Sequence, residues 1–328
     1  PPGFAELRLE RVGVIRAATE REPLAGWASE EVSGWPIPDV AVLDDRRQPL
    51  GRTLSNGAFV INRSLPAGRL ILEKPGYQAF SGRVLQEGEQ AAYVRPALRK
   101  TKHEFGDVIE TITVELQEHL RSIGTWKGRL FLTRASSDRA GEFLSLNNAA
   151  GRESDSTQAL SVPKDLTSFS ECNDRLIALS HWPGILWDLA SGQLEQVCEL
   201  AHTSGSLSWP RGCAFDGKWL WIVENDGATN RFALHAFDLE RKEIVRTLPS
   251  ADPRIAGLAW DGTQFWVSSV EGKVYAVDRG RAEAGGTVEA GRVGKELRGS
   301  YDRLAISQGY LWGVELHSRR ICKIKIRD

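Results

Sequence analysis

Hydrophobic and polar residues follow one recurring pattern over the second part of the 328-residue chain. The phrase "AFDGKWLWIVE" begins at Ala214, and "AWDGTQFWVSS" begins at Ala259. Each phrase is a short apolar run, an Asp-Gly turn and a second apolar run with a central tryptophan. Short β-branched and aromatic runs separated by Gly and Asp are typical of antiparallel strands joined by tight turns. The pattern therefore predicts a repeated β-meander, and in the repeat of Ala259 we expect the outer strand at "GTVEAGRVG", residues 286–294.

The same register occurs five times. Aligned on the central large apolar residue, the repeats place Phe131, Ile177, Trp221, Trp266 and Trp312 in equivalent positions, at intervals of 46, 44, 45 and 46 residues. A period of about 40–45 residues with strand content is the signature of a β-propeller, in which each repeat is one four-stranded blade. Because aromatic side chains bury large areas where blades meet, we expect the tryptophans to pack between blades and not to form a ligand cage.

The last repeat is one strand short. Its final segment, "RRICKIKIRD", reads as a third strand, and a blade left open there would expose an unpaired edge. The segment Val108–Leu116, "VIETITVEL", precedes the first repeat and alternates as a strand does. A helix would also gather its apolar residues on one face, but the Thr and Val content favours a strand. We therefore predict five blades, closed by a strand near residues 108–116.

Residues 1–100 do not share the repeat, so we expect one domain there and the propeller at residues 101–328. "DVAVLD" alternates, "QPLGRTLSNGAFVI" joins two strands through a Ser-Asn-Gly turn, and "AGRLILEKPGYQ" adds a strand that ends at a Pro-Gly turn. These segments predict a small β-sandwich. The expected fold class is therefore all-β, a small β-sandwich plus a five-bladed β-propeller.

The order of these segments resembles the carboxypeptidase regulatory-like (transthyretin-like) β-sandwich family over about residues 8–98. The family's "P-x-V-x-V" strand, "T-x-x-x-G-x-F" hairpin, Gly-led strand and "PGY" turn are matched by Pro38, Val40 and Val42; Thr53, Gly57 and Phe59; Gly68; and Pro75, Gly76 and Tyr77. The resemblance implies an accessory module and no particular activity. The segment "TEREPLAGWASEEVSGWPI" departs from it as an insertion between the first two strands, whose Trp27 and Trp35 either pack against the propeller or form a partner-contacting loop.

The propeller half resembles the five-bladed glutamine cyclotransferase-like class. That resemblance rests on the "DG-x-x-(L/F)-W" turns, which recur in many unrelated propellers. It therefore implies a fold and leaves function open.

Charge and composition exclude several classes of function. The formal net charge is −1, so no strong overall field favours nucleic acid, and the basic run "RPALRKTKH" lacks the interleaved aromatic residues of a nucleic-acid surface. We find no uninterrupted apolar run of about 18 residues and expect no transmembrane segment. The four cysteines show no metal-binding spacing, and we expect buried free thiols, with one disulfide as the alternative.

The chain opens with "PPGFAELRLE" and contains no Met, so we expect a trimmed form. Together with the regulatory-like module, this suggests an exported protein of the bacterial periplasm or cell surface. The oligomeric state is left open.

Loops that follow the second strand of each blade converge on one face of a propeller. Residues at those places combine carboxylates, an arginine, histidines and a tryptophan, which makes this face the best candidate for binding an unknown small molecule, glycan or protein. The candidate ligand-binding residues are Arg134, Ser180, His181, Trp182, Glu224, Asn225, Asp226, Glu271, Glu315 and His317. Ordinary solvated loop residues are the alternative interpretation.

Two classes of function remain. The absence of GxSxG, GxGxxG, Walker A and HExxH strings favours a non-enzymatic binding module. The alternative is an enzyme at the channel mouth (a cyclotransferase, a lyase or a glycan-cleaving activity), with Glu224 and Glu315 as an acid–base pair. His181, Glu224 and His317 come from three repeats and could converge on a metal, but isolated loop histidines are common. We therefore expect no metal and no cofactor.

Overall fold

The computed structural model separates into two compact units, with the boundary between Glu104 and Phe105. Each unit is described by itself. The described residues are 24–61, 69–83, 96–113, 119–135, 141–146, 160–163, 165–181, 184–189, 195–202, 205–206, 210–226, 231–250, 255–269, 271–280, 287–288, 292–315 and 320–327.

The strands of the first unit surround one apolar core. They form a four-stranded sheet and two short ladders: β4 (Pro49–Arg52), β3 (Ala41–Leu43), β6 (Arg69–Glu73) and β7 (Phe80–Arg83) in that order; β1 (Leu24–Trp27) with β5 (Ala58–Ile61); and β2 (Ser29–Glu30) with β8 (Ala97–Leu98). Alternate residues of these strands point inward, as a sheet with one buried face requires. Val42, Phe59 and Leu72 are among the buried core residues.

Two sequence-based expectations for this unit need correction. The Ser-Asn-Gly turn forms, with Gly57 at φ 77°, but the strands on either side of it enter different ladders, so they do not make a hairpin. The segment expected to be an insertion contributes β1 and β2 and is therefore part of the unit's framework. The strand expected before it lies outside the described residues.

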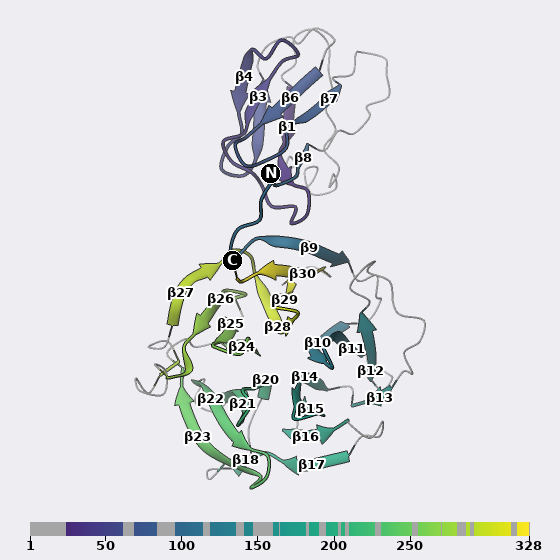
Figure 1. Ribbon diagram of the computed structural model, residues 1–328, viewed down its shortest axis with the longest axis vertical. Coiled ribbons are helices and arrows are strands. Elements are labelled where there is room, and N and C mark those ends of the chain that lie inside the picture. The colour runs from purple at the N-terminus through teal and green to yellow at the C-terminus, as the bar shows by residue number, and fades with distance from the viewer. Residues whose placement is uncertain are drawn as a thin grey trace, which may run out of the picture. The chain divides into compact units, whose positions relative to one another are not determined.

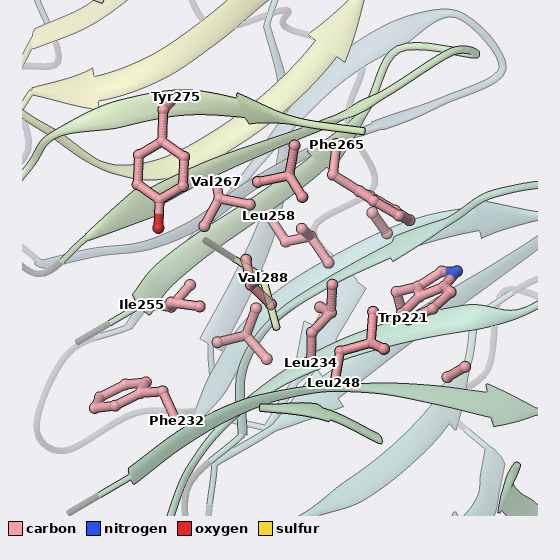
Figure 2. Packing of buried hydrophobic residues seen from close by; sticks show 14 residues of the cluster. Trp221, Phe232, Leu234, Leu248, Ile255, Leu258, Phe265, Val267, Tyr275 and Val288 are labelled. Atoms are coloured by element: carbon pink, nitrogen blue, oxygen red, sulfur yellow. The ribbon is translucent and has the colours of Figure 1, made fainter. Parts of the chain in front are cut away.

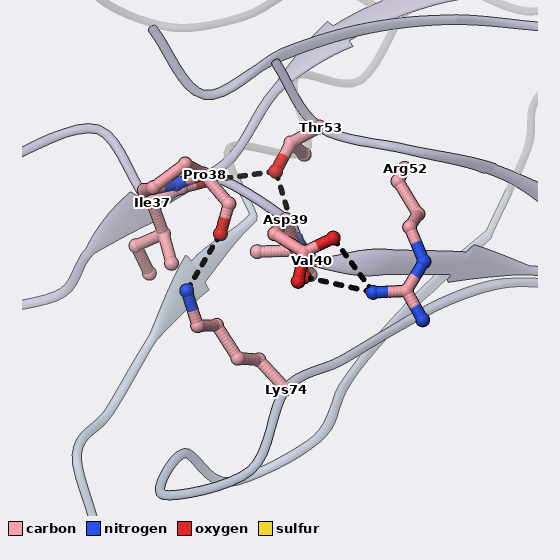
Figure 3. A network of polar contacts seen from close by, with 7 residues as sticks. All are labelled: Ile37, Pro38, Asp39, Val40, Arg52, Thr53 and Lys74. Carbon is pink, nitrogen blue, oxygen red and sulfur yellow. Dashed lines mark hydrogen bonds and ion pairs between the residues drawn. The ribbon is translucent and has the colours of Figure 1, made fainter. Parts of the chain in front are cut away.

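A network of polar contacts fixes the entry into β3 (Figure 3). The Thr53 hydroxyl donates to the Ile37 carbonyl at 2.7 Å and accepts from the Val40 amide at 2.9 Å. Lys74 Nζ donates to the Pro38 carbonyl at 2.6 Å. A single buried hydroxyl therefore provides hydrogen bonds for two backbone groups that the strand pairing does not satisfy.

The second unit is a ring of five four-stranded antiparallel sheets, blades one to five, with their first strands innermost (Figure 1). The first three blades consist, from the centre outward, of β10 (His119–Trp126), β11 (Arg129–Ala135), β12 (Gly141–Leu146) and β13 (Leu160–Val162); β14 (Leu166–Cys172), β15 (Arg175–Ser180), β16 (Ile185–Asp188) and β17 (Glu195–Glu199); and β20 (Pro210–Phe215), β21 (Leu220–Asp226), β22 (Arg231–Asp238) and β23 (Glu243–Pro249). The last two consist of β24 (Ile255–Trp260), β25 (Phe265–Ser269), β26 (Val274–Val277) and β27 (Arg292–Leu297); and β28 (Tyr301–Ser307), β29 (Tyr310–Glu315), β30 (Arg320–Lys325) and β9 (Val108–Thr113). A short hairpin, β18 (Ala201–His202) and β19 (Gly205–Ser206), links blades two and three.

The ring closes as the sequence predicts. Strand β9 pairs with the C-terminal strand β30, with Ile112 opposite Ile321, and so supplies the fourth strand of blade five. The strand interpretation of this segment is confirmed over Val108–Thr113, and residues 114–116 lie outside the described part. One strand position was wrong: the outer strand of blade four is Arg292–Leu297, further along the chain than expected. Val288, expected in that strand, instead lies buried in the core between blades three and four.

The repeated tryptophans pack between blades, as expected. Trp221, Trp266 and Trp312 are at most 1 % exposed. Figure 2 shows Trp221 within the apolar cluster that joins blades three and four, where its ring meets Phe265 edge-on at 5.2 Å between centroids. The repeated phrase is thus a device for packing one blade on the next.

The Asp of each Asp-Gly turn holds its tryptophan in place. Asp216 accepts from Trp221 Nε1 at 2.7 Å and from the turn amides of Lys218 and Trp219, both at 2.8 Å. Asp261 does the same for Trp266, at 3.0 Å. One carboxylate therefore closes the turn and satisfies the buried indole N–H.

Candidate functional site

The innermost strand of every blade carries a β-bulge at the same place, near its start. The pairing with the second strand shifts by one residue there in all five blades, and the bulged residues are Arg121, Thr167, Arg211, Ala256 and Asp302. Bulges bend a strand and re-aim a side chain. The ring therefore presents five equivalent positions at one end of the central channel, which we call the channel mouth.

Just before each bulge, the innermost strand pairs with the position that the sequence singles out on the second strand. Those partners are Arg134, Ser180, Glu224, Ser269 and Glu315. The predicted positions therefore do share one layer of the propeller. For Arg134 the structure describes only the backbone.

The expectation that these residues are exposed in loops is wrong where their side chains are described. Ser180 and Ser269 are buried, and Glu224 is 8 % exposed. Each of them bonds to the third strand of its own blade or to the turn that leads there. The Ser180 hydroxyl accepts from Trp187 Nε1 at 2.8 Å, and the Ser269 hydroxyl accepts from the Lys273 amide at 3.3 Å. This layer holds second and third strands together.

The two carboxylates of the layer are engaged in the same way. Glu224 Oε2 lies 2.7 Å from His235 Nε2, and His235 Nδ1 lies 2.9 Å from the Thr247 hydroxyl. Glu315 makes a two-pronged ion pair with Arg320, at 2.7 and 2.8 Å. Each carboxylate is therefore oriented along its own blade by a neighbouring strand.

The other candidates are distributed unevenly. Glu271 is exposed in the turn after β25, and its carbonyl accepts a 3.4 Å hydrogen bond from Ser300. Asn225 and Asp226 end β21, with their side chains outside what is described. Trp182 and His317 lie outside the described residues.

A charged cluster occupies the channel mouth. We call it the mouth cluster; its members are Asp165, His181, Arg211, Asp302 and Arg303. His181 follows β15 directly, and its ring donates a hydrogen bond to the Pro210 carbonyl, next to Arg211 in the neighbouring blade. Arg303 lies 3.3 Å from the Asp302 carboxylate. Side chains from blades two, three and five thus meet at one place.

The mouth cluster combines two arginines with two aspartates, and the arginine charges act on each other and on His181. Burial lowers the pKa of His181, and the charges of Arg211 and Arg303 lower it further against the opposing effects of Pro210 and Asp165. The pKa of Arg211 is also lowered, first by burial and then by Arg303, with Asp302 opposing. An arginine stays charged under such shifts, so the two guanidinium groups repel each other at the mouth.

Further along the channel is a cavity of about 190 Å³ lined by the innermost strands of all five blades. Its wall combines small residues, among them Gly124, Ala214 and Ala259, with larger and polar ones such as Glu171 and Trp260. A space of this size holds a few water molecules or a slender group.

Sequence reasoning placed the site on the second strands and missed the arginines of the first strands. A signal for one of them is present in the repeat alignment. The position after the bulge is Ser122, Ser168, Gly212 and Gly257 in four blades, and Arg303 in the fifth. A large charged residue in one of five otherwise small positions stands out.

In the described part of the chain, no group of three or more His, Cys, Asp or Glu side chains is placed to hold a metal ion. The four cysteines are free thiols, three of them buried. No helix there has the length and apolarity that crossing a bilayer requires.

No protein-family model matches this chain, and no curated protein matches it. Similar solved structures include glutaminyl cyclase of Myxococcus xanthus, at 14 % identity and a TM-score of 0.46 over 67 % of this chain and 95 % of that chain. A nidogen/laminin complex matches at 10 % identity and a TM-score of 0.40, over 60 % of this chain and 72 % of that chain. The hydrazine synthase of Kuenenia stuttgartiensis matches at 10 % identity and a TM-score of 0.41, over 78 % of this chain and 92 % of that chain. We rest no argument about fold or activity on likeness at this level.

Proposed function

We propose that this protein is a binding module that recognises its ligand or partner at the channel mouth of the propeller. The observation that carries the proposal is the bulge repeated in all five blades with a residue that varies: arginine in blades one and three, and Thr167, Ala256 and Asp302 in the others. A fixed backbone frame with varied side chains is how rigid scaffolds present recognition sites. The mouth is also where charged side chains of three blades meet.

The contacts of the two candidate carboxylates bear on the alternative, an enzyme at the same place. Glu224 and Glu315 are held by His235 and Arg320 within their own blades. A pair working as acid and base needs both carboxyls directed at one substrate. We therefore favour binding over catalysis.

For the first unit we propose the carboxypeptidase regulatory-like β-sandwich as its type, in an accessory role. The matched residues have structural tasks that support this: Thr53 ties the entry of β3, and a side chain at Gly57 would meet the Ala28 carbonyl at 2.4 Å. We further propose that the protein is exported. Fractionation of the native organism tests this, and a full-length cytosolic protein without a cleaved leader would contradict it.

Hydrogen–deuterium exchange with a ligand or partner found by co-purification tests the main proposal. We expect protection to concentrate on the starts of the innermost strands, at residues 119–121, 165–167, 210–211, 255–256 and 301–303. Protection on the opposite end, at the turns 126–129, 216–219 and 261–264, would overturn it. So would a footprint confined to the first unit.

A further inference from the structure

The first step concerns how near the innermost strands of blades three, four and five come to one another. A Cβ atom at Gly212 would lie 3.1 Å from the Leu258 amide nitrogen, and one at Gly257 would lie 2.8 Å from the Asp302 carbonyl oxygen. Strands that approach this closely leave no room for side chains between their backbones. The bulged residues of the three blades are therefore immediate neighbours around the mouth.

The second step concerns what stands between the two arginines. Arg211 occupies the bulge of blade three, and Arg303 follows the bulge of blade five. The bulge of blade four, between them, carries Ala256, whose side chain ends at Cβ. The bulge of blade four therefore places no long side chain between the strands that carry Arg211 and Arg303. The repulsion between these two arginines agrees with this arrangement.

The third step concerns the partners of the two arginines. Asp302 contacts Arg303 at 3.3 Å through its carboxylate, and the Arg303 guanidinium also donates to the Asp302 carbonyl at 3.2 Å. Arg211 makes no ion pair with any residue in the described part, and its buried Nε has no hydrogen-bond partner there. Such a buried donor costs free energy until a ligand accepts from it.

We propose that Arg211 and Arg303 form an anion-binding site at the channel mouth, bordered by His181, for a small molecule that carries a carboxylate, sulfate or phosphate group. This inference rests on the proposed function, since it names the ligand chemistry of the same face. Two guanidinium forks carried by neighbouring strands around the mouth can match the oxygens of such a group, and they do so better than two ammonium groups would. The bound anion also relieves the repulsion between the two arginines.

Isothermal titration of the full chain with sulfate, inorganic phosphate and succinate, at low ionic strength, tests the site. We expect saturable binding of at least one of them, weakened by roughly tenfold or more in Arg211→Gln and in Arg303→Gln. The matched control is Arg246→Gln, which removes the same charge from the exposed outer strand β23 and should change affinity by less than about twofold. The order of affinity among the three probes identifies the class of anion.

The geometry of the fork supplies a second variant. Arg303→Lys keeps the charge and the long stem but loses the planar pair of donors, so we expect an affinity between those of the wild type and Arg303→Gln. Thermal melts of every variant, without anion, establish that each is folded. If Arg303→Gln fails to fold, Arg303→Lys and Arg211→Gln still decide the question.

Dependence on pH gives a readout that a purely structural arginine would not move. The charged groups around His181 are Asp165, Arg211 and Arg303, and an anion between the arginines favours its protonated form. Sulfate does not titrate near neutrality, so its affinity should rise as pH falls from about 8 to about 6 and should stay flat in His181→Gln.

Three results would overturn the inference: no saturable binding of any probe up to about 100 mM, equal weakening by Arg246→Gln, or binding that survives in both Gln variants at the mouth. Failure of the inference and failure of the proposed function are distinguishable. An exchange footprint on the mouth with no anion dependence retains the function and rejects the site. Anion binding that depends on the two arginines, together with a partner footprint elsewhere, retains the anion site and rejects the proposed function.

Discussion

At the scale of single residues, one carboxylate decides how firmly a blade is locked to its neighbour. Asp216 has a fully buried side chain, holds Trp221 and also accepts an ion pair from Arg279 at 2.5 Å. Blade five has Ser307 in the equivalent place, and Trp312 Nε1 is buried there without a hydrogen-bond partner among the described residues. The equivalent tryptophans of blades three and five therefore differ: the indole N–H of Trp221 has a hydrogen-bond acceptor, and that of Trp312 has none among the described residues.

Replacing Asp216 by Ala should destabilise the propeller by about 3 kcal/mol, because it leaves the buried indole N–H of Trp221 without its acceptor and removes the ion pair with Arg279. Ser307→Ala is the matched control, since it removes one neutral hydrogen bond, to the Gly128 carbonyl, and should cost about 1 kcal/mol. Chemical denaturation of both variants measures the difference. Equal losses would show that Asp216 is no more than a turn residue.

The same aspartate predicts a dependence on pH. Burial acts to raise the pKa of Asp216, but hydrogen bonds from Trp219, Trp221 and Lys218 and the charge of Arg279 outweigh it, so the pKa lies below its usual 3.8. A lowered carboxyl pKa gives stability that is present above 3.8 and is lost as pH falls through the folded-state value. The difference in stability between wild type and Asp216→Ala should therefore shrink in acid. A constant difference from neutral pH down to about pH 3 would contradict this.

Glu224 and Glu271 stood together as candidates in the sequence, and the structure separates them. Glu224→Ala should cost about 1–3 kcal/mol, because it leaves His235 with an unmet buried nitrogen. Glu271→Ala, at an exposed turn, should stay within about 0.5 kcal/mol. Thermal melts of the two variants measure this. An unchanged melting temperature for Glu224→Ala would mean that the buried hydrogen bond makes no net contribution to stability.

At the scale of elements, the decisive strand is β9. It covers the open edge of β30, and Ile112 and Ile321 share one apolar cluster with residues of blade one. The backbone pairing continues past the strand, where Gly106 donates to the Lys325 carbonyl at 2.7 Å. Closure of the ring therefore needs residues from 105 onward.

Deleting residues 1–104 should leave a folded propeller, whereas deleting 1–113 should unfold or aggregate it, because the edge of β30 is then exposed. Circular dichroism melts and size-exclusion chromatography of the two truncations measure this. Two truncations that melt together would show that β9 is dispensable.

The elements show where sequence reasoning works. The blade register follows from Trp221, Trp266 and Trp312, since a period in large apolar residues reports burial directly. The outer strand of blade four was misplaced because Val288 looks like a strand residue and is buried for another reason. Of the mouth cluster, the sequence candidates included His181 and missed Arg211 and Arg303. These two arginines belong to the site only because strands of different blades meet at the axis, and no local pattern encodes that meeting.

At the scale of the whole molecule, the chain holds separate apolar cores in its two units. Compact units with their own cores unfold as separate transitions when little binds them together. Each core can therefore be perturbed by itself.

Leu72→Ala, in the first unit, and Trp266→Ala, in the propeller, are both buried-core truncations. We expect the former to cost about 2–5 kcal/mol and the latter about 3–5 kcal/mol, each through a cavity. Scanning calorimetry should show each variant lowering one transition and leaving the other in place. A single transition lowered by both variants would mean that the units unfold as one.

The pairing of β9 with β30 also governs how the protein is made. Lys323 and Glu110 form an ion pair across this junction although 213 residues separate them in the chain. During translation, every blade can pair its own strands soon after it leaves the ribosome, but the ring stays open until residues 320–325 have emerged. Long-range closure of this kind is slow and leaves strand edges exposed meanwhile. Premature termination near the C-terminus therefore removes more than a terminal strand: it yields a propeller that has no means of becoming a ring.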